Sequence, residues 1–98
     1  MRLVNLMLDG RDEASVIREA ERLARQLEHE KGSAEGVDLL GPAPQPMSRL
    51  KGKHRWHVTL RGRDHKLLRA LAEKALIMAE GASGQVRLAV DVDPASLL

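Results

Sequence analysis

Alternating apolar and polar residues predict strands in four parts of the chain. Residues 2–8 are almost wholly apolar and stop at the turn signal Asp9-Gly10, which indicates a buried first strand. Residues 37–41 predict a short second strand. The prolines at 42, 44 and 46 are expected to end it, because proline has no N–H to donate to a strand ladder, and an extended loop is expected to follow. Residues 54–61 alternate most clearly, and 85–93 alternate again. The inward residues predicted from these alternations are Val4, Leu6, Leu8, Trp56, Val58, Leu60, Val86, Leu88, Val90 and Val92.

Two further stretches repeat at helical spacing. The first has Asp12 where an N-cap belongs and Gly32 as its stop, and the second runs from the cap Asp64 to Gly81. The outer face of the first helix carries charges of both signs, a pattern typical of a solvated surface, so we assign it no function. The apolar faces are Val16, Ile17, Ala20, Leu23, Ala24 and Leu27 in the first helix, and Leu67, Leu68, Leu71, Ala75 and Met78 in the second.

The element order is therefore βαββαβ. In α+β proteins this order is typical of the ferredoxin-like fold, in which two helices cover one face of a four-stranded antiparallel sheet. The chain has 98 residues, enough for one modest core, so we expect residues 1–98 to form a single domain.

Composition restricts the core and the compartment. Trp56 is the one aromatic residue and there is no cysteine, so the core must be aliphatic, and disulfides and thiolate metal sites are excluded. No apolar run approaches the length of a membrane span and no signal-peptide pattern opens the chain. We therefore expect a cytoplasmic protein.

Charge is divided unevenly along the chain. Residues 1–48 carry six Lys/Arg against nine Asp/Glu, whereas residues 49–98 carry ten against five. Eight of the basic residues fall between Arg49 and Arg69, where Asp64 is the one acidic residue. This concentration of positive charge predicts an anionic partner.

Two segments resemble the C-terminal domain of the PriA family of replication-restart helicases (primosomal protein N′). They are Val37-Asp-Leu-Leu-Gly-Pro-Ala-Pro44, continuing to Arg49-Leu-Lys-Gly-Lys-His-Arg-Trp56, and Val90-Asp-Val-Asp-Pro-Ala-Ser96. The family has a Leu-Gly-Pro-x-Pro turn, a basic segment ending in an aromatic residue, a strand, a helix and a closing Val-Asp-Val-Asp-Pro strand, all present here in order. His54 departs from it, because the family commonly has an aromatic residue there.

The resemblance implies a fold like that of ribosomal protein S10 and a non-catalytic module beside a helicase core. Such a module helps to bind forked or single-stranded DNA and borders the surface that receives the tail of single-stranded-DNA-binding protein. A basic residue near the start of the second helix takes part in that docking, which here corresponds to His65 or Lys66. ATP, Mg²⁺ and Zn²⁺ would belong to other parts of the parent protein, and this chain is expected to hold no cofactor.

The basic segment is the predicted DNA site. Lys and Arg neutralise phosphates and release counterions, so they bind nucleic acid without reading its sequence. The alternative is a solvated loop and strand edge. Trp56 offers either a stacking platform or a core side chain, and its parity with Val58 and Leu60 favours the core. The DNA-binding residues predicted are Arg49, Lys51, Lys53, Arg55, His57, Arg61, Arg63, Lys66 and Arg69.

No catalytic or metal site is predicted. His54 and His57 would point to opposite faces of one strand, without a nearby cysteine or carboxylate to complete a ligand set. Asp91 and Asp93 share a strand face but are more readily explained by local pairing, for instance with Arg87. No nucleotide-binding or nucleophile motif is present, and Asp9-Gly10-Arg11-Asp12 does not resemble the phosphate loop of acylphosphatases.

Two other functions fit the same fold. An RNA-recognition motif would need exposed aromatic residues on its strands, which are absent, although an S10-like module binding RNA and protein through a basic loop is compatible with the charge. A pure protein-docking domain would use the basic surface for acidic peptide tails. Preference for forked DNA over structured RNA would separate the DNA-binding function from the S10-like one.

Overall fold

A computed structural model of the chain describes residues 2–50, 52–80 and 84–92, with the backbone alone for 46–50 and 80. The elements follow in the order β1 (Arg2–Gly10), α1 (Glu13–Lys31), β2 (Val37–Leu50), β3 (Lys53–Gly62), α2 (His65–Glu80) and β4 (Val86–Val92). The predicted βαββαβ order is confirmed. None of the described helices is long and apolar enough to cross a membrane.

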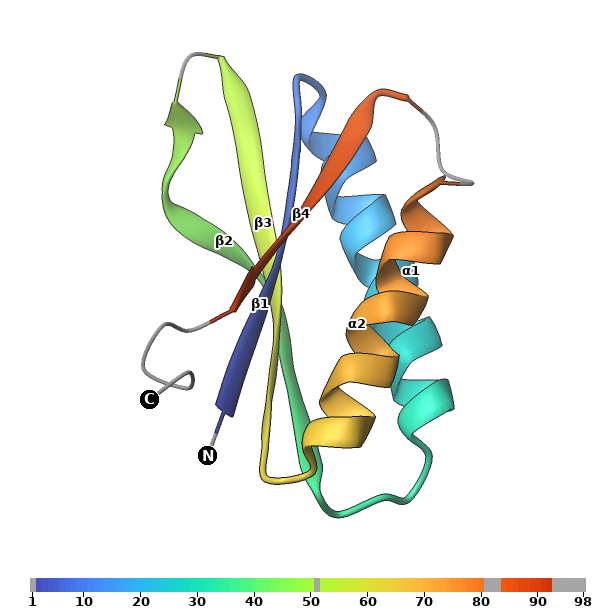
Figure 1. Cartoon of the computed structure of the whole chain (residues 1–98). Coiled ribbons are helices and arrows are strands. Elements are labelled where there is room, and N and C mark those ends of the chain that lie inside the picture. The colour runs from blue at the N-terminus through green and yellow to red at the C-terminus, as the bar shows by residue number, and fades with distance from the viewer. Residues whose placement is uncertain (1, 51, 81–83, 93–98) are drawn as a thin grey trace.

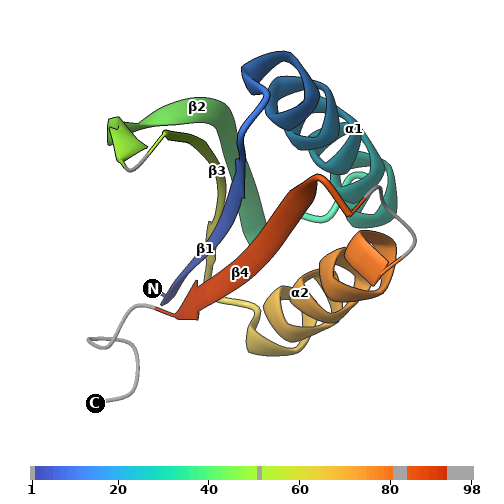
Figure 2. The same ribbon diagram turned by 90° about the horizontal axis from the view of Figure 1, so that it is seen from above.

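The four strands form one antiparallel sheet in the order β2-β3-β1-β4, and both helices pack on the same face of it (Figure 1). Seen from above, the sheet is strongly curved, and the hairpin of β2 and β3 turns away from α2 (Figure 2). Among the described residues, no helix lies on the opposite face of the sheet. The ferredoxin-like arrangement is therefore confirmed, with one face of the sheet left open.

The core lies between the sheet and the helices and is built from aliphatic side chains. Leu6, Leu27 and Leu60 are among its largest fully buried members, and the described residues include no buried polar or charged side chain. Trp56 packs against this core from the helix-covered face but stays partly exposed. Its predicted role in packing is confirmed.

Both helices begin at the predicted caps. At the start of α2 the Asp64 carboxylate accepts the backbone N–H of Leu67 at 3.0 Å. Asp12 precedes α1 with extended backbone angles, yet its carboxylate makes no capping bond and instead accepts the Ser15 hydroxyl at 2.6 Å. Gly32 ends α1 with φ +60, a conformation that favours glycine. The predicted stop at Gly81 lies outside the described residues.

The second strand differs from its prediction. Instead of ending at residue 41, β2 continues through Pro42, Pro44 and Pro46, with interruptions of its pairing between Leu40 and Ala43 and beyond Pro44. Gly41, at φ +99, is the residue that permits the first of these irregularities. β2 is an edge strand, so prolines can occupy it without removing ladder bonds on both sides. The predicted extended loop is consequently the outer half of a hairpin.

Candidate nucleic-acid interface

The open face of the sheet carries polar side chains in register. Because β1 and β3 are antiparallel with Asn5 opposite Thr59 and Asp9 opposite Arg55, side chains of odd number on both strands project from this face. The even-numbered partners, such as Leu6 and Val58, are buried against the helices. Arg55, His57 and Arg61 therefore lie together on the open face, and His54 lies on the other, as the alternation predicts.

A hydrogen-bonded cluster occupies the centre of the open face. The Asn5 Oδ1 atom accepts the Thr59 hydroxyl at 3.0 Å and lies 3.1 Å from His57 Nδ1. His57 donates in this contact when Nδ1 carries the proton, which leaves Nε2 as the acceptor of a neutral ring. Asn5 and Thr59 thus fix the orientation of His57, a role that sequence alone does not show because Asn5 and His57 are 52 residues apart in the chain.

The arginines that flank this cluster keep unused donors. Arg61 Nη2 lies 3.5 Å from Asp38 Oδ2 on the neighbouring strand β2, a long contact between exposed groups. The Nε atoms of Arg55 and Arg61 are shielded from solvent and have no hydrogen-bond partner within the described part of the chain. A surface ion pair such as that between Arg61 and Asp38 is weak, so the Arg61 guanidinium can exchange it for a phosphate.

A second basic group lies at the end of the open face where β4 begins. Asp9 lies opposite Arg55 on one side and opposite Arg87 on the other, and Arg87 Nη2 is 3.4 Å from Asp9 Oδ2. The suggested local pairing of Arg87 with Asp91 is therefore wrong, because the register of β1 and β4 brings Asp9 beside it. Asp93 lies outside the described residues.

The predicted DNA-binding residues divide into two groups. Arg63, Lys66 and Arg69 are exposed at the turn before α2 and on its first turns, away from the residues of the open face. Lys51 lies outside the described residues, and for Arg49 the structure describes the backbone but not the side chain. The open-face group consists of Lys53, Arg55, His57 and Arg61.

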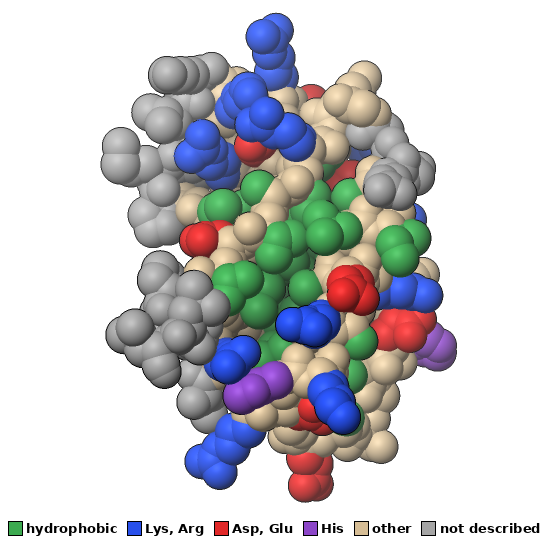
Figure 3. Space-filling view, viewed as in Figure 1, with side chains coloured by type: hydrophobic (Ala, Val, Ile, Leu, Met, Phe, Trp, Pro, Cys, Tyr) green, Lys and Arg blue, Asp and Glu red, His purple; other side chains and the backbone are tan. Residues whose placement is uncertain are grey.

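An apolar groove separates α2 from β4. Its walls include Leu68, Ala72 and Leu76 of α2 and Val92 of β4, and Leu76 and Val92 are each more than two-fifths exposed. The charged and histidine side chains that line the same groove are Arg2, His65, Lys66, Arg69 and the acidic Glu73. Figure 3 shows apolar side chains gathered between β4 and α2, with Lys, Arg and His side chains, together with acidic ones, toward the lower end of the view.

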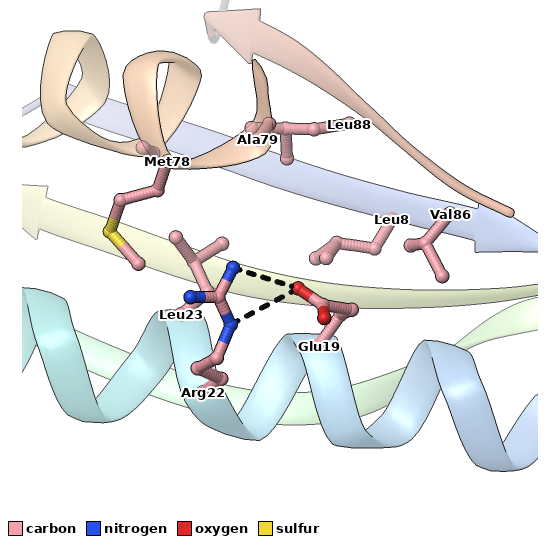
Figure 4. A pocket seen from close by; sticks show the side chains of 9 residues that line it. Leu8, Glu19, Arg22, Leu23, Met78, Ala79, Val86 and Leu88 are labelled. Carbon is pink, nitrogen blue, oxygen red and sulfur yellow. Dashed lines mark hydrogen bonds and ion pairs between the residues drawn. The ribbon is translucent and has the colours of Figure 1, made fainter. Parts of the chain in front are cut away.

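A smaller hollow lies in the seam between the two helices and offers no comparable chemistry. Leu8, Leu23 and Met78 line it, and the Glu19–Arg22 ion pair of α1, at 3.1 Å, lies across it (Figure 4). The pair joins residues three apart on one helix, so it stabilises α1 locally. Within residues 2–50, 52–80 and 84–92, no three His, Cys, Asp or Glu side chains gather as metal ligands would.

Comparison with solved structures supports the fold. The de novo designed protein Foldit4 superposes with a TM-score of 0.71 at 17% identity, covering 94% of each chain. An amidase of the hydantoinase/carbamoylase family from Burkholderia phymatum superposes with a TM-score of 0.65 at 12% identity, covering 95% of this chain and 28% of that one. At such identities these likenesses show the fold alone.

Comparison by sequence points to one family. A family model described as Primosomal protein N C-terminal domain matches residues 1–95. The Replication restart protein PriA of Haemophilus influenzae is 41% identical over 63 residues, which make up 63% of this chain and 8% of that protein. The chain therefore spans only a small part of the length of this curated relative.

Proposed function

Because the chain belongs to the Primosomal protein N C-terminal domain family, we propose that it is a non-catalytic module that holds forked or single-stranded DNA for a replication-restart helicase. The DNA would lie on the open face of the sheet and along the β2–β3 hairpin. The helicase core of the same protein would supply ATP hydrolysis with Mg²⁺, and a separate region would hold Zn²⁺. Such a protein acts on the chromosome and therefore in the cytoplasm.

The observation that carries this proposal is the row formed by Arg55, His57 and Arg61 on a sheet face that neither α1 nor α2 covers. Arg55 and His57 are two residues apart in β3 and therefore about 7 Å apart, and Arg61 lies four residues beyond His57, about 13 Å further along the strand. A nucleic-acid strand that runs along β3 would therefore meet the two arginines with different phosphates. Asn5 and Thr59 add hydrogen-bonding groups between them. No aromatic residue faces the row, so we expect phosphate contacts and little base stacking.

A second function is favoured by the groove between α2 and β4. Its apolar walls and its basic residues, set against the acidic Glu73 alone among its described residues, suit a peptide that combines acidic residues with an apolar one, and the resemblance to PriA proteins makes the tail of single-stranded-DNA-binding protein the expected peptide. His65 and Lys66, at the start of α2, both line this groove. We therefore assign peptide docking to the groove and DNA to the open face.

The DNA proposal is tested by fluorescence anisotropy with labelled fork, single-stranded and duplex DNA and a structured RNA across a salt series. We compare Arg55→Ala/Arg61→Ala with Arg18→Ala/Arg25→Ala, which removes the same charge from the exposed face of α1. The open-face variant should bind single strands about 10-fold more weakly and lower the salt slope by about 1.4, because about 0.7 is lost with each phosphate contact.

The α1 variant should stay close to the unmodified chain. Equal losses in the two double variants would show that net charge, rather than the open face, controls binding. Binding stronger to structured RNA than to forked DNA would favour the S10-like alternative, and no binding at low salt would leave peptide docking as the function.

A further inference from the structure

We propose that the groove at the end of the open face, where β1 ends and β3 and β4 begin, binds one backbone phosphate of the nucleic acid through Arg11, Lys53 and Arg87. The inference rests on the proposed DNA-holding function and extends it to two residues, Arg11 and Arg87, that lie outside the basic segment of the sequence. The ligand is a phosphodiester anion.

The sheet register forms this groove from three distant segments. Gly10 lies opposite His54 of β3 and opposite Val86 of β4, so the end of β1 is level with the first residues of both neighbours. The residues that line the groove between them are Asp9, Gly10, Arg11, Asp12, Lys53, Gly84, Gln85 and Arg87. Lys and Arg side chains gather at this end of the molecule, at the top of the view in Figure 3.

The carboxylates of the groove leave the Arg87 guanidinium available to bind an anion. These two carboxylates both have partners already: Asp12 accepts the Ser15 hydroxyl at 2.6 Å, and Asp9 is contacted by Arg87 at 3.4 Å. The Arg87 side chain is 71% exposed, whereas that of Asp9 is 16% exposed. The guanidinium therefore makes a single long contact with a recessed carboxylate and presents its remaining donors to solvent.

Asp9 thus acts as a counter-ion that holds Arg87 at the groove until a phosphate takes its place. A planar guanidinium binds a phosphate with two parallel hydrogen bonds, which is stronger than the long single contact to Asp9. Arg11 and Lys53 approach from the other walls of the groove. Three cations from three segments can then surround one anion, next to the Arg55 end of the open-face row.

Gly84 provides a test that leaves these cations in place. A Cβ built at Gly84 meets no atom within 4 Å, and its φ is not in the region that favours glycine, so a side chain fits there without strain. Gly84→Glu places a carboxylate in the groove. Gln26→Glu makes the same change of charge at an exposed position on α1, on the helix side of the sheet, and is the matched control.

The measurement is anisotropy of a labelled single strand across a salt series, with thermal melts to show that each variant folds. Gly84→Glu should weaken binding about fivefold or more and Gln26→Glu by less than about twofold, because screening weakens charges more than about 10 Å from the site. Arg11→Gln/Arg87→Gln should lower the salt slope by about 0.7, the value of one phosphate on a single strand. Asp9→Asn should tighten binding.

The outcomes separate this inference from the proposed function. If the unmodified chain binds DNA but Gly84→Glu behaves like Gln26→Glu and the double arginine variant keeps its salt slope, the groove is not a phosphate site and the open-face proposal stands. If the unmodified chain does not bind DNA at low salt, both fail. A loss confined to Gly84→Glu, with the slope of the arginine variant unchanged, would show steric blocking and overturn the assignment of Arg11 and Arg87.

Discussion

Single residues at the β1–α1 turn show how local hydrogen bonds set the charge state of this end of the molecule. The hydrogen bond from the Ser15 hydroxyl is the main cause that lowers the pKa of the exposed Asp12 carboxyl below its ordinary value of 3.8. Desolvation acts against this effect, whereas the nearby backbone N–H groups of Ser15 and Ala14 and the charge of Arg18 act in the same direction as the hydroxyl. Asp12 is therefore an anion over the whole neutral range, balanced by a local donor.

We predict that Ser15→Ala raises the pKa of Asp12 toward its ordinary value. A carboxyl whose pKa is lower in the folded chain stabilises the fold above its unfolded pKa, and this stabilisation is lost as the pH falls through the folded pKa. The variant should therefore lose less stability between neutral pH and acid. NMR titration of the Asp12 side-chain carbon measures the pKa, with Ser33→Ala, beyond the end of α1, as control. An unchanged midpoint in Ser15→Ala would contradict the assigned cause.

For single residues, the sequence predicts where a residue lies relative to a helix more readily than which group its side chain bonds. Asp12 and Asp64 were both placed correctly as the residues before a helix, because Asp at a helix start is a local signal. Only Asp64 caps with its carboxylate, since Asp12 bonds to Ser15 instead. The partner of Arg87 is set by the offset between β1 and β4, which no local pattern contains.

At the scale of elements, β3 and α2 form as their patterns predict, while β2 does not. The alternation in β3 and the helical repeat in α2 are dictated by the need to bury one side. β2 carries three prolines, and the local rule that proline ends a strand fails there because the strand lies at the sheet edge. Edge position is a property of the topology, so it could not be read from the segment itself.

We predict that Asp64→Ala lowers the free energy of unfolding by about 1 kcal/mol, because it removes the acceptor of the Leu67 N–H at the first turn of α2. Asp38→Ala is the control: its carboxylate is also exposed, and its contact with Arg61 is 3.5 Å long, so the loss should be below about 0.5 kcal/mol. Urea unfolding followed by circular dichroism measures both. Equal losses would mean that the cap does not stabilise α2.

At the scale of the whole molecule, the sheet separates two surfaces of different chemistry. The open face of the sheet presents arginines with polar neighbours. The groove between α2 and β4 presents apolar side chains with basic residues. Charge in the sequence predicted one continuous basic segment, yet the turn before α2 directs its two ends to different surfaces. The two proposed functions, DNA binding and peptide docking, therefore fall on separate surfaces of one small domain, a separation that composition does not reveal.

Two leucines of nearly equal exposure test this separation. Leu76, 45% exposed, lines the groove, and Leu40, 42% exposed, lies on β2 opposite Thr59 of the open face. Leu76→Glu should weaken binding of the acidic tail peptide of single-stranded-DNA-binding protein about 10-fold, because it removes an apolar contact and repels the peptide, and should leave DNA affinity almost unchanged. Leu40→Glu should do the reverse, since its new carboxylate lies near the arginines of the open face.

Anisotropy of the labelled peptide and of labelled single-stranded DNA, measured on both variants, gives the four affinities. Each variant adds one negative charge, so differences between them report position rather than net charge. If Leu76→Glu weakens DNA binding as much as Leu40→Glu does, the two surfaces form one site. In that case DNA and the acidic peptide should compete for the unmodified chain, whereas separate surfaces require that saturating peptide leaves the DNA affinity in place.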